Sequence, residues 1–212
     1  WAYLEARPDG FELRAATDAE IAQAKSRRRQ AESMVRVPSV DLSRRGLPEL
    51  GEIGMKDSAA VGAKAANLGA LFRHKGTRWD VPPGFVITFA HYVDFLRHNK
   101  LEGAVKTLLT DPSLKSDKAA RRKALDSLRQ KIRGGRHLPK LRKALLAKLR
   151  QPDYAGKGVF VRSSTNAEDL DGFNGAGLYD TVPNVKGGDN VLAAISQVWA
   201  SLWNVRAYEE RD

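Results

Sequence analysis

The chain has 212 residues, a formal net charge of +11 and a hydrophobic content of 42%. This length suits one large domain, or one domain with an appendage, and the apolar fraction can supply a buried core. Cysteine is absent, which excludes a disulfide framework and a cysteine-ligated zinc site and fits the expected cytoplasmic location. Apolar runs fall short of the ~18 residues of a membrane span, so no membrane partner is expected.

The positive charge is concentrated in one stretch of the chain. Residues 100–150 contain 16 basic and 4 acidic side chains, a balance of +12, so the remaining residues sum to −1. Any interaction with a polyanion would therefore depend on that stretch.

The N-terminal residues predict a hairpin followed by a helix. Trp1–Ala6 and Phe11–Ala16 partly alternate between apolar and polar residues, and Pro8-Asp9-Gly10 between them is typical of a turn. Thr17-Asp-Ala-Glu20 has the spacing of a capping box, which predicts a helix from about Asp18 to Glu32.

A domain boundary is expected after that helix. Residues 35–54 carry two prolines and three glycines without a clear period, which favours a linker or an extended crossing segment. We therefore assign 1–46 to a separate N-terminal part and 47–212 to the main domain. Because the chain starts at Trp1 rather than Met, it is expected to be a piece of a longer protein.

The main domain is predicted to alternate helices and strands. Helical spacing or amphipathic character marks five segments, at Asp57–Arg73, Ala90–Asn99, Ser116–Arg133, Pro139–Leu149 and Asn190–Glu210. Short β-rich runs end at Thr88 and at Ser164. The expected fold class is α/β, with a mixed sheet containing the strands near Phe85 and Phe160 and a projecting helical insertion at about 100–150.

Arg162 and Lys64 are the candidate anion ligands. Arg162 lies near the end of the strand predicted within Gly158–Ser164, and two serines follow it. Its guanidinium, which can bind an anion through two N–H groups, would lie beside free backbone amides. Lys64 lies among glycine and alanine residues that let a ligand or another backbone come close, but Gly62-Ala-Lys64 does not complete a Walker A motif. From these patterns alone, a surface ion pair for Arg162 and a solvated helix-face position for Lys64 remain open.

The segment from Glu168 to Thr181 is predicted to be a mobile loop. Gly172, Gly175 and Gly177 allow close approach to a ligand. The acidic residues within it lack the spacing of an EF-hand calcium loop. None of the four histidines has a metal-ligand spacing or a nucleophile beside it.

The basic helices support a rival hypothesis. Six cations on the first of them could line a polyanion groove: Arg121, Arg122, Lys123, Arg129, Lys131 and Arg133. Residues 100–150 contain no Phe, Tyr or Trp, so base stacking is not offered and nucleic acid is not the expected partner. We expect Arg121, Arg122, Arg129 and Lys131 to be exposed to solvent.

Five ordered motifs together resemble a known family. They are Val61-Gly-Ala-Lys-Ala-Ala-Asn-Leu-Gly69, Val81-Pro-Pro-Gly-Phe-Val-Ile-Thr88, Val161-Arg-Ser-Ser-Thr-Asn-Ala-Glu-Asp-Leu170, Gly175-Ala-Gly-Leu-Tyr-Asp-Thr-Val-Pro-Asn-Val185 and Val198-Trp-Ala-Ser-Leu-Trp-Asn-Val-Arg-Ala207. Their order and spacing resemble the pyruvate/phosphoenolpyruvate-binding ATP-grasp domain of phosphoenolpyruvate synthase, pyruvate phosphate dikinase, rifampicin phosphotransferase and the glucan water dikinases. The resemblance covers about 47–211, and its fourth motif is closest to the water dikinase branch.

The resemblance implies an ATP-binding N-terminal lobe of an ATP-grasp domain. It implies that Lys64 and Arg162 bind nucleotide phosphates, with Arg162 also catalytic, and that Gly177, Asp180 and Thr181 belong to the loop over the triphosphate. It further implies magnesium as a cofactor, with its ligands in a second half downstream of this chain. Residues 1–46 would be the tail of a preceding swivelling phosphohistidine domain, the second partner of this lobe besides ATP.

The implied activity is an ATP-dependent phosphotransfer of the dikinase type. A phosphoryl group would pass from ATP to a carrier histidine on another domain and then to pyruvate, to water with a glucan, or to another acceptor. A lobe that carries half of the nucleotide site is expected to be inactive alone. The alternatives are a basic helical polyanion-binding module and an inactive relic of the fold.

Overall fold

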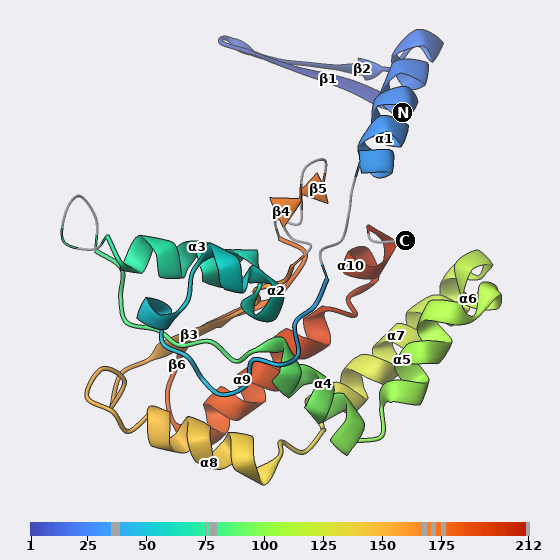
Figure 1. The fold of residues 1–212 in the computed structure, drawn as a ribbon. Coiled ribbons are helices and arrows are strands. Elements are labelled where there is room, and N and C mark those ends of the chain that lie inside the picture. Colours follow the sequence, from blue (N-terminus) through green and yellow to red (C-terminus); the bar gives the residue numbers. More distant parts are fainter. Residues whose placement is uncertain are drawn as a thin grey trace. The chain divides into compact units, whose positions relative to one another are not determined.

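The computed structural model describes residues 1–34, 39–74, 76, 80–166, 169–170, 173–174 and 177–210. Its contacts divide the chain into two compact units, one made of residues 1–37 with 170–174 and one made of the rest. Figure 1 labels the helices and strands of both. No helix in the described ranges combines the length and the apolar character needed to cross a membrane.

The first unit contains the predicted hairpin and helix. Strands β1 (Ala2–Arg7) and β2 (Gly10–Ala15) pair antiparallel and precede α1 (Asp18–Met34). The expected capping box is present, because the Thr17 amide donates to Glu20 Oε2 at 2.8 Å and the Glu20 amide donates to Thr17 Oγ1 at 3.3 Å. The pairs Leu4–Leu13 and Ala6–Phe11 place apolar side chains on one face of the hairpin.

The second unit contains the remaining helices and two of the remaining strands. Its helices are η1 (Leu50–Glu52), η2 (Met55–Asp57), α2 (Ser58–Val61), α3 (Ala63–Phe72), α4 (Phe89–His98), α5 (Glu102–Thr110), α6 (Pro112–Ser116), α7 (Lys118–Arg133), α8 (Pro139–Lys148), α9 (Gly188–Ser201) and α10 (Val205–Glu209). Its sheet pairs β3 (Val159–Arg162) with β6 (Thr181–Val185). The two-residue strands β4 (Asp169–Leu170) and β5 (Phe173–Asn174) pair with each other, and Leu170 and β5 are counted with the first unit. This mixture of helices and short strands confirms the expected α/β class.

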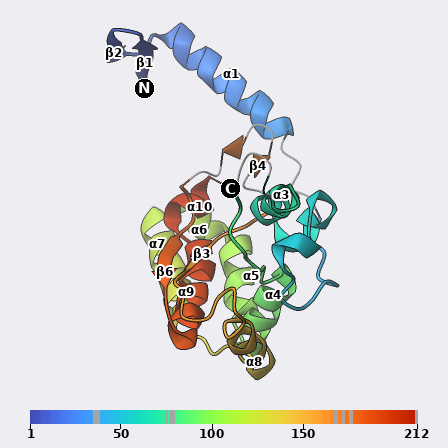
Figure 2. The same cartoon turned by 90° about the vertical axis from the view of Figure 1, so that its left-hand side faces the viewer.

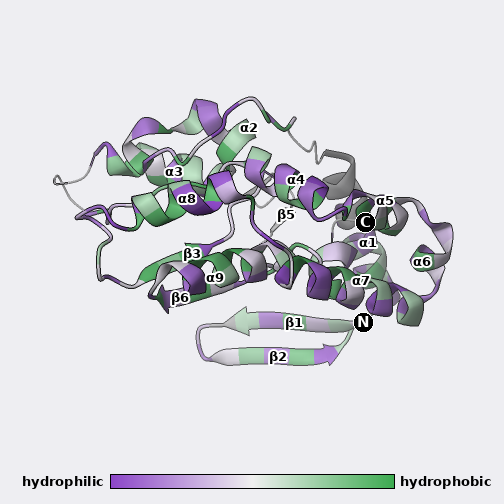
Figure 3. Ribbon diagram, turned by 90° about the horizontal axis from the view of Figure 1, so that it is seen from below, coloured by the Kyte–Doolittle hydropathy of each residue, from purple (hydrophilic) through white to green (hydrophobic). Residues whose placement is uncertain are grey.

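Helix α9 organises the core of the second unit. Its buried residues Val191, Leu192 and Ile195 pack against the valines of β3 and β6, and Figure 2 shows the helix running beside these strands. A second cluster joins α9 and α10 to helices α4 to α7, through residues such as Phe95, Leu125 and Trp203. The hydropathy colouring of Figure 3 shows the resulting alternation of apolar and polar faces along these helices. The basic helices therefore share a core with α9.

The predicted mixed sheet is wrong. Among the described residues, Phe85 forms only an isolated antiparallel bridge with Glu49, while β3 pairs with β6. Pro82 and Pro83 lack amide donors, and the neighbouring amide of Val86 donates to the Pro48 carbonyl at 2.9 Å. The segment therefore pairs with residues 48–50 instead of with β3.

Two long predicted helices are each interrupted. The segment Asp57–Arg73 divides into η2, α2 and α3, with a break at Gly62, whose φ is +85°. The C-terminal helix divides into α9 and α10 around Trp203. The small-residue face of α3 packs against backbone, because a Cβ on Gly69 would lie 2.6 Å from the Ile53 carbonyl oxygen.

The expectation that Arg121 is solvent-exposed is wrong. Its relative exposure is 7%, its guanidinium pairs with Glu209 of α10, and it donates to the Leu114 and Lys115 carbonyls at 3.1 and 2.9 Å. Arg129 is half-buried and pairs with Asp126, whereas Arg122 and Lys131 are exposed as expected. Position 121 lies on the same helical face as the buried Leu125 and Leu128, so the fold uses this arginine to join α7 to α6 and α10.

We predict that Arg121→Ala lowers the free energy of unfolding by about 2–3 kcal/mol, because Leu114 and Lys115 lose their donor and Glu209 its partner. The adjacent Arg122→Ala should change it by less than about 0.5 kcal/mol, since Arg122 is exposed. Urea denaturation of both variants makes the comparison. Equal effects would show that Arg121 is a surface cation.

Candidate functional site

The first turn of α3 is fastened to the segment that follows β3. The Ala63 amide donates to the Thr165 carbonyl at 2.9 Å, and the Ala65 amide donates to Ser164 Oγ at 2.9 Å. Helix N-termini leave several amides without an intrahelical partner, so these two bonds satisfy donors that the helix cannot. Lys64 lies between the two bonded residues, and Arg162 lies two residues before Ser164. We call this pair of bonds the α3 clamp.

Gly62 permits the clamp. It precedes α3 with φ of +85° and ψ of 162°, a conformation that glycine adopts readily. A Cβ at this position would lie 2.5 Å from the carbonyl carbon of Ser164, well inside van der Waals contact. The backbone approach that brings Lys64 toward the end of β3 therefore requires a residue without a side chain.

The β3–β6 pairing brings Arg162 and Thr181 together. The two residues are directly opposite in the antiparallel register, one at the end of β3 and the other at the start of β6. Directly opposite residues have Cβ atoms about 4.5–5.5 Å apart. Both side chains are exposed, and no hydrogen bond or ion pair joins Arg162 to another residue in the described part of the chain.

A β-bulge follows this pair. Val161 pairs with Val182 and Val159 pairs with Val185, so β6 carries one more residue than β3 over this interval, and Asn184 has φ of +51°. Bulges of this kind bend a strand and re-aim its side chains. The bulge lies toward the start of β3, so the pairing of Arg162 with Thr181 at the other end of the strand stays regular.

Asp180 is held by α9 and the turn after it. Its amide donates to Ser201 Oγ at 3.0 Å, and its carboxylate accepts from Gln197 and Asn204 at 3.4 Å each. These contacts position Thr181 through its immediate neighbour. Gly177 is exposed with φ of +74°, while Gly172 and Gly175, the other glycines of the predicted loop, lie outside the described residues.

Metal-ligating side chains do not cluster in the part of the chain that the structure describes. The described residues contain no group of three His, Asp or Glu side chains that could hold a metal ion. The carboxylate beside Thr181 already accepts hydrogen bonds from two amide side chains.

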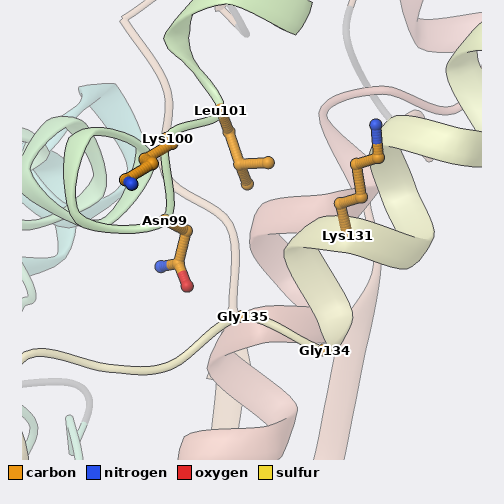
Figure 4. Close-up of a pocket in the computed structure, with 6 residues that line it drawn as sticks. All are labelled: Asn99, Lys100, Leu101, Lys131, Gly134 and Gly135. Carbon is orange, nitrogen blue, oxygen red and sulfur yellow. The ribbon is translucent and has the colours of Figure 1, made fainter.

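A surface hollow of about 420 Å³ lies elsewhere, where α4 meets the end of α7 (Figure 4). It contains none of the predicted site residues; its lining is Asn99, Lys100, Leu101, Lys131, Gly134 and Gly135. The Asn99 side chain already makes three hydrogen bonds within the protein. It donates to the Phe95 and Arg136 carbonyls and accepts from the Arg136 amide. The hollow is therefore best understood as a by-product of helix capping.

The sequence patterns proposed Lys64 and Arg162 but did not reveal that α3 is hydrogen-bonded to the turn after β3. In those patterns, Gly62 was part of a small helical face and Ser164 was a generic polar residue after a strand. Their roles depend on a contact between positions separated by 99 residues. The only local signal was a glycine immediately before a lysine-bearing helix.

We expect Gly62→Ala to lower the free energy of unfolding by at least about 2 kcal/mol, because both the backbone conformation and the contact with Ser164 oppose a side chain. Gly103→Ala is the matched control. Its Cβ would meet nothing within 4 Å, and alanine is favoured over glycine in a helix, so stability should stay constant or rise by about 0.5–1 kcal/mol. Thermal denaturation distinguishes the two, and a harmless Gly62→Ala would contradict the α3 clamp.

Comparison with known proteins identifies the family. The family model described as pyruvate phosphate dikinase, AMP/ATP-binding domain, matches residues 58–212. This range contains α3, β3 and β6 together with the α3 clamp.

Curated relatives agree with that match. The chain is 34% identical over 186 residues to the phosphoenolpyruvate synthase of Aquifex aeolicus, covering 82% of this chain and 21% of that protein. It is 33% identical over 175 residues to the enzyme of Aeropyrum pernix, with 81% and 21% covered, and 34% identical over 163 residues to that of Escherichia coli, with 76% and 20% covered. The chain thus spans about one fifth of the length of these relatives. It belongs to the family of pyruvate phosphate dikinase AMP/ATP-binding domains.

Proposed function

We propose that this chain binds the triphosphate of ATP at Lys64, Arg162 and Thr181, as the N-terminal lobe of an ATP-grasp domain. The observation that carries the proposal is the α3 clamp, which joins the lysine-bearing helix to the turn after Arg162. The register adds Thr181 opposite Arg162. Triphosphate charge is spread over several oxygens, so ligands from separate elements must converge to neutralise it.

Each residue has a distinct part in the proposed site. Arg162 provides a planar guanidinium that can hold two phosphate oxygens at once, and Lys64 provides a compact cation on a flexible stem. Thr181 offers a hydroxyl donor beside Arg162, and Gly177 lets the preceding backbone come close to the phosphates. Asp180 acts as a positioning residue through its bonds to α9. Arg162 is the catalytic member, because a guanidinium stabilises charge on the transferring phosphoryl group.

We further propose the dikinase-type reaction for the full-length protein. ATP would phosphorylate a carrier histidine on another domain, which would pass the group to pyruvate, to water with a glucan, or to another acceptor. The relatives described above are phosphoenolpyruvate synthases, which supports this class of reaction. Magnesium would be held by residues outside this chain, and the isolated chain would bind ATP weakly without transferring phosphate.

Residues 1–46 are proposed to be the tail of a phosphohistidine domain. Their hairpin exposes four large apolar side chains, Trp1, Leu4, Phe11 and Leu13, each more than 60% exposed. A two-stranded hairpin is marginally stable in water without a further apolar layer. A preceding domain would supply that layer.

In the full-length protein, Lys64→Ala and Arg162→Ala are each expected to lower the rate of phosphoryl transfer from ATP by about 100-fold or more, as loss of a charge-stabilising group typically does. Lys123→Ala is the matched control, because Lys123 is an exposed cation on α7 and should leave the rate unchanged. Transfer can be followed as release of AMP and phosphate. Wild-type rates in both site variants would reject the assignment of this site.

A further inference from the structure

The β3–β6 sheet has two chemically different faces. Val159, Val161 and Val185 point toward α9 and pack against its apolar residues. Because side chains alternate along a strand, Phe160 and Arg162 point to the opposite face. Both of these residues are exposed, and Phe160 is 69% exposed.

Phe160 therefore lies on the same face of the sheet as Arg162 and Thr181, two of the three proposed phosphate ligands. Two residues along a strand place Phe160 roughly 6.6 Å from Arg162, measured along β3. Thr181 is opposite Arg162, and exposed Pro183 belongs to the bulge that lies opposite Phe160. An aromatic ring, a guanidinium and a hydroxyl thus share one open face, called here the outer face.

We propose that the Phe160 ring stacks on the base of the nucleotide whose triphosphate binds Arg162. This inference rests on the proposed function and adds a base subsite to it. Charge complementarity between Arg162 and the triphosphate fixes the direction of the ligand on the outer face. The base lies toward the start of β3 and the phosphates toward its end.

The chemistry of this face suits a nucleotide. Every base has a π-face that can stack on an aromatic ring, and the contact needs no hydrogen-bond readout. The contact with Phe160 buries apolar surface that the second unit leaves exposed. It therefore favours nucleotides over inorganic polyphosphates without choosing strongly among bases.

The test compares ATP with inorganic tripolyphosphate, which lacks both the base and the ribose. Dissociation constants for both ligands are measured on the 212-residue chain by phosphorus NMR titration with excess magnesium. Phe160→Ala should weaken ATP binding about tenfold, the loss expected for one stacked base, and leave tripolyphosphate binding unchanged. Arg162→Ala should weaken both ligands. Leu109→Ala, an exposed apolar control on α5, should weaken neither.

The outcomes separate this inference from the proposed function. Failure of the wild-type chain to bind either ligand would overturn both. A different result would overturn the base subsite alone. In that case Arg162→Ala weakens the binding of both ligands, while Phe160→Ala leaves the ratio of ATP affinity to tripolyphosphate affinity unchanged.

A second variant tests the contact directly. Phe160→Trp keeps an aromatic ring in place, so ATP affinity should be retained and the emission of the new tryptophan should change when ATP binds. Tripolyphosphate should cause no such change. Subtracting the response of the wild-type chain removes the contribution of its four tryptophans. Equal responses to the two ligands, after this correction, would contradict stacking.

Discussion

Two hydrogen bonds fix the relation between α3 and β3, and the arrangement of the proposed site depends on them. The amides of Ala63 and Ala65 donate to Thr165 and Ser164, which attaches the helix that carries Lys64 to the turn after Arg162. The bonds need a close backbone approach, and Gly62 allows it by having no Cβ. Donors that a helix terminus cannot use internally therefore join two segments nearly one hundred residues apart.

The two faces of the β3–β6 sheet have different environments, because one face is buried against α9 and the other is exposed. The inner face of the β3–β6 sheet packs valines on α9, while the outer face leaves Phe160 and Arg162 open. On the far side of α9, helices α4 to α7 contribute to a shared core, and Arg121 joins α7 to α10. Most of the chain's excess positive charge lies on these helices, and part of it has a structural role. Net charge alone therefore does not point to the proposed site.

Local patterns in the sequence predicted most elements of the fold. The capping box before α1, the amphipathic basic helices and the strand ending at Arg162 depend on short-range chemistry that the sequence shows directly. The partner of β3, the break at Gly62 and the burial of Arg121 depend on contacts between distant positions, which no local window contains. For the proposed site, motif resemblance suggested Lys64, Arg162 and Thr181. The pairing of Arg162 with Thr181 and the α3 clamp could not be read from the sequence, because both join positions that are far apart in the chain.

Mapping backbone amide shifts during an ATP titration tests the central claim most directly. The 212-residue chain is labelled with nitrogen-15, and tripolyphosphate serves as a parallel ligand. The account predicts that the largest shifts occur at Gly62–Ala66, Arg162–Thr165 and Gly177–Thr181, three segments that only the fold brings together. Shifts confined to the basic helices α7 and α8, with these three segments unaffected, would contradict it.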